Sequence, residues 1–171
     1  IIPSEDREQL QKNLVLSHCA GIGEPLPEDV TRLMMVLKIV SLSLGASGVK
    51  WSTIKQIERI INSGIVPEIP HQGSVGASGD LAPLAHMAAV MIGEGFAFYN
   101  GEKLSGFEAL KRAGIEPITL GPKEGLALLN GTQFSTACAL ASLLDAWRSV
   151  LNSIVISSLS TDAIMGSTSP L

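Results

Sequence analysis

The chain has 171 residues, which is enough for one domain with a substantial core. Only 16% of the residues are charged, compared with about 25% in an ordinary globular domain, whereas 46% are hydrophobic. This balance excludes intrinsic disorder, and the net charge of −4 argues against a nucleic-acid-binding surface. A membrane or other protein subunits must therefore cover the apolar excess.

The last part of the chain, residues 125–171, carries only three charged side chains. The uncharged stretch between Glu124 and Asp145 is long enough to suggest a membrane span. Polar residues within it, such as Asn130 and Gln133, would be poorly satisfied in lipid. We therefore expect protein subunits, and no membrane, as the partner of this region.

The two cysteines, Cys19 and Cys138, form neither a disulfide framework nor a metal-binding pattern. Both lie in apolar stretches, which favours buried free thiols in a reducing compartment and hence a cytoplasmic protein. The chain begins at Ile1 and ends without a closing element. We expect residues 1–171 to be a single segment of a longer protein.

The first half of the chain is predicted to be helical. A helix begins near Ser4, with acidic residues in its first turn, and stops before Gly21. A second helix over 28–44 is apolar on nearly all sides, which is typical of an interior helix. A third helix begins at Ser52 as its N-cap, and glycines and prolines then indicate a loop over 64–80.

The second half adds a hairpin and further helices. A helix is predicted over 81–94, and a hairpin over 96–104 turns at Asn100-Gly101, the pair that favours a type I′ turn. Ser105 begins a capping box for a short helix. A long helix over 132–160 has coiled-coil-like apolar spacing. The predicted fold class is mainly α, a long-helix bundle with one short β-hairpin.

The most unusual segment is the glycine-rich stretch 73–80. It is not a Walker phosphate loop, because no Lys-Ser/Thr pair follows its last glycine. One interpretation is a plain loop in which Asp80 caps the next helix. In a sharper one, the nitrogen of Gly79 attacks the carbonyl of Ala77, and loss of water from the adduct and from Ser78 leaves an electrophilic methylene. The neighbouring glycines permit the tight bend that this ring closure needs.

The segment 73–86 resembles the signature of the aromatic amino acid ammonia-lyases, and the segment 123–133 is also similar to that family. The resemblance extends from Leu10 to Pro170. It implies that Ala77-Ser78-Gly79 cyclises autocatalytically to 4-methylidene-imidazol-5-one (MIO), with no metal or dissociable cofactor. It also implies a fumarase/aspartase-like helical bundle, a homotetramer, and a place in the bundle core for residues 132–160.

Substrate preference in this family follows a residue pair that here is Ser17-His18. Phenylalanine-specific members resemble Phe-Leu at this pair, tyrosine-specific members His-Leu, and histidine-specific members Ser-His. An imidazole substrate needs a polar partner where a phenyl ring needs an apolar one. The resemblance therefore implies conversion of L-histidine to trans-urocanate and ammonia. The alternative for His18 is a histidine that interacts with the dipole at a helix C-terminus.

The resemblance implies roles for three more residues. Asn130 would lie beside MIO and form a hydrogen bond to it or to the substrate, Gln133 would support substrate binding, and Asp80 would help to form or polarise MIO. From the residues alone, Asn130 belongs to a common Asn-Gly turn pair and Gln133 is a helix-start residue. His86 is predicted to be structural, packed beneath the loop.

Two other functions stay open. One is a phenylalanine or tyrosine ammonia-lyase or an aminomutase, and the other is a non-catalytic helical assembly fragment whose loop is not cyclised. The resemblance also implies that the catalytic base and the carboxylate-binding residues lie outside this segment. We therefore expect the segment alone to lack lyase activity.

Overall fold

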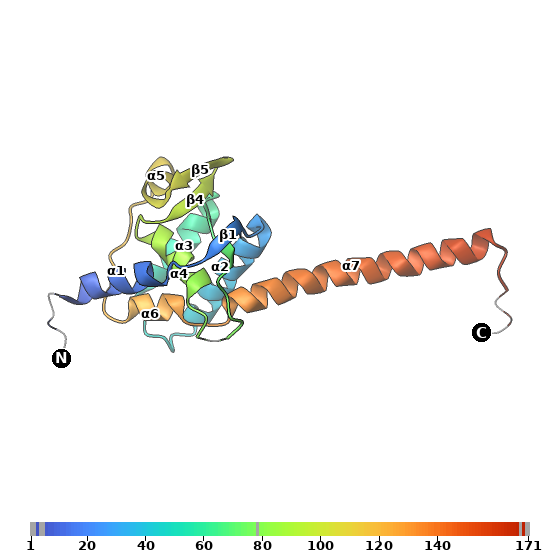
Figure 1. Cartoon of the computed structure of the whole chain (residues 1–171), viewed down its shortest axis with the longest axis horizontal. Coiled ribbons are helices and arrows are strands. Elements are labelled where there is room, and N and C mark those ends of the chain that lie inside the picture. Colours follow the sequence, from blue (N-terminus) through green and yellow to red (C-terminus); the bar gives the residue numbers. More distant parts are fainter. Residues whose placement is uncertain (1–2, 4–5, 78, 168, 170–171) are drawn as a thin grey trace. The chain divides into compact units, whose positions relative to one another are not determined.

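The structure is a computed structural model that describes residues 3, 6–77, 79–167 and 169 (Figure 1). The chain divides into two compact units, Ile1–Ala137 and Cys138–Leu171, and each is described by itself. Ser78, on which the predicted ring closure depends, lies outside the described residues.

Helices dominate the described residues, and the predicted mainly α class with a short hairpin is confirmed. The helices are α1 (Arg7–His18), α2 (Glu28–Ser43), α3 (Trp51–Ser63), α4 (Ala82–Met91), α5 (Gly106–Arg112), α6 (Glu124–Leu129) and α7 (Gln133–Ala163). The strands are β1 (Ile22–Pro25), β2 (Val66–Pro67), β3 (Pro70–Gln72), β4 (Phe96–Tyr99) and β5 (Glu102–Ser105).

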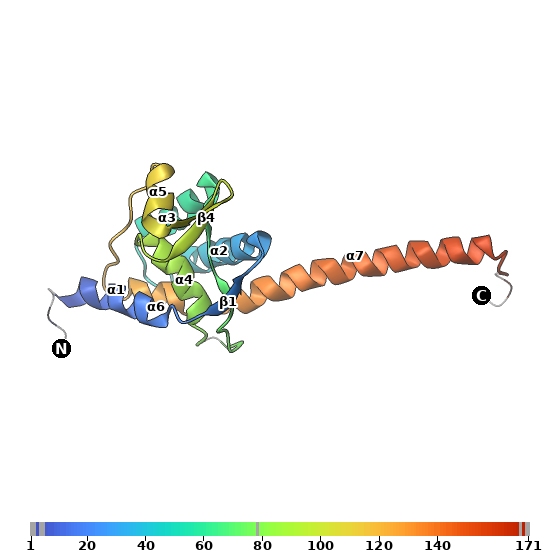
Figure 2. The same cartoon turned by 45° about the horizontal axis from the view of Figure 1, so that its top comes forward.

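Helix α4 forms the centre of the first unit. Its side chains from Pro83 to Met91 are buried with one exception, His86, which is half-buried. It packs against α1, α3, α5 and α6, and both views place it among these helices (Figures 1 and 2). A helix that is apolar all round is buried all round, so α4 is the interior helix of this unit.

The prediction that the helix over 28–44 is interior is wrong. Helix α2 buries Met34, Met35 and Leu42 but leaves Val36 and Val40 exposed. Both sides of α2 are apolar in sequence, so hydropathy alone could not show which side this chain covers.

Helix α3 is amphipathic and ends at Gly64, whose φ of +87° is the left-handed conformation that glycine favours. Its buried side chains are Thr53, Ile54, Gln56, Ile57 and Ile60. The predicted cap at Ser52 is wrong, because the helix begins at Trp51 and its N-cap is Lys50, which forms no side-chain capping bond.

The predicted loop over 64–80 contains two strands that the sequence did not reveal. Strand β3 pairs antiparallel with β1, and β2 joins β4 and β5 in an antiparallel three-stranded sheet. Pro67 and Pro70, which indicated a loop, lie inside these very short strands. The irregular loop is therefore confined to the residues between β3 and α4.

The predicted hairpin and capping box are confirmed. Asn100 and Gly101 have φ angles of +51° and +81°, as a type I′ turn requires, and they join β4 to β5. The Ser105 hydroxyl accepts a hydrogen bond of 3.2 Å from the backbone N–H of Glu108 at the start of α5.

The long helix predicted over 132–160 is confirmed as α7. Within the second unit its large apolar side chains are exposed, namely Leu143, Leu144, Trp147, Val150, Leu151, Ile154, Val155, Ile156 and Leu159. By length and composition alone, the stretch Glu124–Ala163 could cross a membrane. A helix that is covered by other subunits has the same composition.

Candidate active site

The glycine-rich loop is held together by its own residues. The Ser74 hydroxyl donates a hydrogen bond to the Asp80 carboxylate, and the Gly76 N–H donates to the Ser74 hydroxyl over 3.2 Å. Asp80 is only 5% exposed. The interpretation of Asp80 as a helix cap is wrong, because Leu81 occupies the N-cap position of α4 and no side chain caps that helix.

A backbone hydrogen bond joins the first residue of the Ala77-Ser78-Gly79 stretch to the residue after it, because the Asp80 N–H donates to the carbonyl oxygen of Ala77 over 3.0 Å. A Cβ built on Gly79 would meet nothing within 4 Å among the described atoms. Ala77 and Asp80 are therefore held close together, and Gly79 has space beside it among the described atoms.

The predicted recognition pair lies in the last turn of α1. Nδ1 of His18 is 2.7 Å from the carbonyl oxygen of Leu14. Because a carbonyl only accepts, Nδ1 carries the proton in this contact. The Ser17 hydroxyl donates to the same carbonyl over 3.1 Å. Both side chains are therefore oriented by one backbone group, and the described residues place no hydrogen-bond partner on Nε2 of His18.

Gly21 joins the end of α1 to the loop and to α4. A Cβ on Gly73 would lie 3.0 Å from the Cα of Gly21, so the two backbones approach closely. The Gly21 N–H donates to Nε2 of His86 over 3.1 Å, so this nitrogen must be unprotonated. Burial lowers the pKa of His86, while the charge of Glu68 raises it less, which favours the neutral ring. His86 is therefore structural, as predicted.

The end of α1, the glycine-rich loop and the start of α4 line a common cavity of about 310 Å³. It is lined by Ser17, His18, Ala20, Gly73, Val75, Gly79, Asp80, Leu81 and Ala82. Of the residues that the sequence singled out, Ser17, His18, Gly79 and Asp80 share this cavity, whereas Ala77, Asn130 and Gln133 do not line it. The cavity is open to the surface, and its volume lies at the lower end of the roughly 300–1,000 Å³ that small-molecule sites have.

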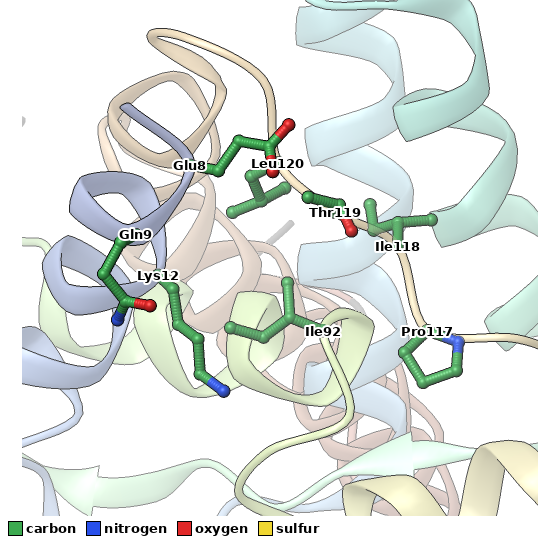
Figure 3. Close-up of a pocket in the computed structure, with 8 residues that line it drawn as sticks. All are labelled: Glu8, Gln9, Lys12, Ile92, Pro117, Ile118, Thr119 and Leu120. Atoms are coloured by element: carbon green, nitrogen blue, oxygen red, sulfur yellow. The ribbon is translucent and has the colours of Figure 1, made fainter. Parts of the chain in front are cut away.

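A second cavity of about 290 Å³ lies between α1 and the segment after α5 (Figure 3). It is lined by Glu8, Gln9, Lys12, Ile92, Pro117, Ile118, Thr119 and Leu120. None of the predicted site residues lines it, and Lys12 is engaged with Glu94 over 2.6 Å. It does not contribute to the candidate site.

Asn130 and Gln133 lie on either side of Gly131 at the junction of α6 and α7. The backbone carbonyl of Asn130 accepts a hydrogen bond of 2.8 Å from the ammonium group of Lys38. A Cβ on Gly131, whose φ is +147°, would overlap the side-chain amide of Gln133. The Gln133 side chain thus folds back over Gly131, and its Oε1 is buried without a partner among the described residues.

Glu124 and Gly125 connect α6 to other helices. The Glu124 carboxylate accepts hydrogen bonds from the Thr53 hydroxyl at 2.6 Å and from the backbone N–H groups of Lys50 at 2.8 Å and Gly121 at 2.7 Å. Burial raises the pKa of Glu124, but these hydrogen bonds and the Lys50 charge outweigh it and lower the pKa overall. The Gly125 N–H donates to the Gln11 side chain over 2.9 Å.

Sequence reasoning missed Lys38 and Glu124. Lys38 carried a signal, because it is a single charged residue within an otherwise apolar stretch of the helix over 28–44. Glu124 carried none beyond its place in the second segment that resembles the family. In two of the three hydrogen bonds of the Glu124 carboxylate, the partner is more than 70 residues away in the chain.

Cysteine and metal chemistry have little support in the described residues. Cys19 and Cys138 are both partly buried, not fully as expected, and burial raises the pKa of Cys19 to about 11. Both thiols are therefore protonated near neutral pH. Within residues 3, 6–77, 79–167 and 169, no cluster of three histidine, cysteine or acidic side chains could hold a metal ion.

The described residues form a mainly helical segment with a glycine-rich loop beside a small cavity. The family model for aromatic amino acid lyases matches residues 1–171, and the chain belongs to that family.

Individual relatives agree with this assignment. The chain is 62% identical over 170 residues to histidine ammonia-lyase of Roseobacter denitrificans, covering 99% of this chain and 33% of the relative. It is similar to the crystal structure of histidine ammonia-lyase from Trypanosoma cruzi, with 39% identity and a TM-score of 0.92 over 98% of this chain and 33% of that one. It is also similar to phenylalanine aminomutase of Pantoea agglomerans, with 38% identity and a TM-score of 0.91 over 99% and 33%. The chain thus spans about a third of the length of these relatives.

Proposed function

We propose that this chain is the MIO-bearing segment of a histidine ammonia-lyase, which converts L-histidine to trans-urocanate and ammonia. The observation that carries the proposal is the cavity that joins Ser17 and His18 to Gly79 and Asp80. The 62% identity to a curated histidine ammonia-lyase supports the same substrate.

The loop fits the formation of MIO from Ala77-Ser78-Gly79. The hydrogen bond from Asp80 N–H to the Ala77 carbonyl holds these two residues together, and the space beside Gly79 leaves room for a ring. MIO supplies an electrophile that ordinary side chains lack. Asp80 has a supporting role, because its buried carboxylate holds Ser74 and so links the two ends of the loop.

Ser17 and His18 suit recognition of the imidazole ring. With its proton on Nδ1 and directed at the Leu14 carbonyl, a neutral His18 offers the lone pair of Nε2 as an acceptor. The N–H of the substrate imidazole would satisfy it, whereas a phenyl ring has no such donor. A site built around a hydrogen bond discriminates strongly against a ligand that lacks the matching group.

Asn130 and Gln133 are proposed to contact the substrate or MIO. Asn130 is exposed and its carboxamide can both donate and accept a hydrogen bond. The buried Oε1 of Gln133 has no partner among the described residues, and an unpaired buried acceptor is unfavourable. An N–H donor from a ligand would remove that penalty.

The chain is also proposed to assemble as a homotetramer. Exposed Leu144, Trp147, Leu151 and Ile154 on α7 follow a spacing that suits packing against other helices. The resemblance places the base and the carboxylate-binding residues in segments outside this chain. We therefore expect no turnover by the isolated 171-residue polypeptide, and a detectable rate in a urocanate absorbance assay would contradict this.

The test uses the full-length lyase that carries this chain. Urocanate formation from L-histidine is followed by absorbance, beside phenylalanine and tyrosine as competing substrates, and intact mass reports whether the loop has lost two waters. We expect turnover of histidine alone and the loss of both waters. Full retention of the two waters would instead support the non-catalytic helical assembly.

A phenylalanine lyase or an aminomutase is the second candidate, because phenylalanine aminomutase of Pantoea agglomerans has a very similar structure. Release of cinnamate, or isomerisation of phenylalanine without net ammonia release, would favour this candidate in the same substrate panel.

A further inference from the structure

Lys38 is the most unusual charged residue of the first unit. It lies on α2 among buried apolar side chains and is only 1% exposed. Its ammonium group donates to the backbone carbonyl of Asn130 over 2.8 Å. No ion pair among the described residues includes Lys38. The lysines and arginines that do form ion pairs, such as Lys12, Lys55 and Lys103, lie at the surface.

Packing alone does not explain a lysine at this position. A buried ammonium group is unfavourable, and burial lowers the pKa of Lys38 to about 8. A methionine would fill similar space without that penalty, as Met34 and Met35 do on the same helix. Among the described residues, the hydrogen bond to the Asn130 carbonyl is the interaction that compensates for burial of the ammonium group.

The carbonyl group that Lys38 binds lies where the chain leaves α6 and continues into Gly131. Asn130 is the C-cap of α6 and leaves the helix with φ −88° and ψ +130°. Gly131 follows with φ +147°, and the Gln133 side chain folds over it. Because the peptide group is planar, fixing the Asn130 carbonyl also fixes the peptide plane that leads into Gly131.

We propose that Lys38 is a positioning residue for the lyase reaction, which holds the Asn130 carbonyl and thereby orients the Asn130 carboxamide at the site. The inference rests on the proposed function, since it requires that Asn130 serves the substrate or MIO. Lys38 itself is buried and acts only through Asn130.

The experiment compares variants of the full-length lyase with the wild type. Lys38→Met removes the N–H donor while keeping the volume, and we expect kcat to fall about tenfold or more, with a smaller change in KM. We expect its melting temperature to stay the same or rise, because the buried charge has gone. Met34→Leu, a buried change on the same helix, is the matched control and should leave both kinetic constants within about twofold.

Asn130→Ala and the double variant Lys38→Met/Asn130→Ala decide whether Lys38 acts through Asn130. If it does, Lys38→Met lowers kcat by less than about twofold in the Asn130→Ala background. Lys38→Arg keeps a charged donor and should restore much of the activity that Lys38→Met loses. Unchanged kcat in folded Lys38→Met, or losses that simply multiply in the double variant, would overturn the proposal.

The same variants distinguish a failure of the proposed function from a failure of the proposed role of Lys38. A wild type without lyase activity, or an Asn130→Ala variant with full activity, would show that the proposed function or the role of Asn130 is wrong, whatever Lys38 does. Failure of every Lys38 variant to fold would assign Lys38 to folding alone and would overturn the positioning role.

Discussion

The loop over 73–80 and the segment over 123–133 both belong to stretches that resemble the family, yet they are held in different ways. Most of the described residues of the loop are exposed, although Asp80 is buried, and the loop's hydrogen bonds run between its own residues, chiefly Ser74 and Asp80. The second segment is held from outside, by Gln11 of α1, Lys38 of α2 and the start of α3. The proposed ring closure in the loop needs space around the backbone, whereas the proposed orienting role of the second segment needs buried partners.

The largest effect on stability is expected for Glu124→Ala. This change leaves the Thr53 hydroxyl and two backbone N–H groups buried without their acceptor, and we expect a loss of about 4 kcal/mol in the free energy of unfolding. Urea unfolding of the full-length protein measures it. Glu58→Ala, at an exposed ion pair, is the control and should cost less than about 1 kcal/mol. Equal effects would mean that the buried hydrogen bonds of Glu124 do not hold the second segment in place.

The lowered pKa of Lys38 predicts how the free energy of unfolding changes at alkaline pH. Its pKa is lowered from 10.5 to about 8 in the folded chain, so between these values the unfolded state binds more protons and stability rises with pH. The shift corresponds to a gain of about 3 kcal/mol. The difference between unfolding curves of wild type and Lys38→Met, from pH 7 to 10.5, isolates this contribution. A wild type that loses stability relative to Lys38→Met over this range would contradict the lowered pKa.

A smaller loss is expected for Gly125→Ala. The added Cβ would lie 2.9 Å from Oε1 and 3.2 Å from the backbone oxygen of Gln11, so the hydrogen bond between α6 and α1 must shift. We expect a cost of about 1–2 kcal/mol, since the better helix propensity of alanine offsets part of the clash. In a Gln11→Ala background the cost should shrink. An undiminished cost there would show that the clash is not with the Gln11 side chain.

The smallest effect on stability is expected for Gly79→Ala in the loop. No described atom lies within 4 Å of the added Cβ, so the change in the free energy of unfolding should stay within about 0.5 kcal/mol. Ring closure should nevertheless suffer, because a side chain on this residue hinders the approach of its nitrogen to the Ala77 carbonyl. Intact mass should show retention of the two waters. A large destabilisation would mean that the loop is as tightly held as the second segment.

Local sequence patterns predicted much of the secondary structure. The turn at Asn100-Gly101, the Ser105 cap and the stop at Gly64 depend on residues a few positions apart, and all three were correctly placed. The short strands β1, β2 and β3 escaped prediction, because their pairing partners are distant in the chain and their prolines indicated a loop.

The candidate site was predicted only in part. Ser17, His18, Gly79 and Asp80 were singled out by the resemblance to the family, but nothing local showed that they share a cavity. The close approach of Gly21 and Gly73, and the bond from Gly21 to His86, join them across more than 50 residues of chain. Such contacts follow from packing and not from any short pattern.

The sequence by itself determined the helical class, because that class depends on residue type and local spacing, and its resemblance to the family singled out the Ala77-Ser78-Gly79 stretch and the Ser17-His18 pair as candidates. Only the tertiary structure decided that α4 and not α2 is the interior helix, that Asp80 binds Ser74 in place of capping α4, and that Lys38 holds Asn130. The physical reason is that apolar periodicity shows which residues avoid water but not which neighbour covers them. A buried charge or carboxylate finds its partner only when distant segments pack together.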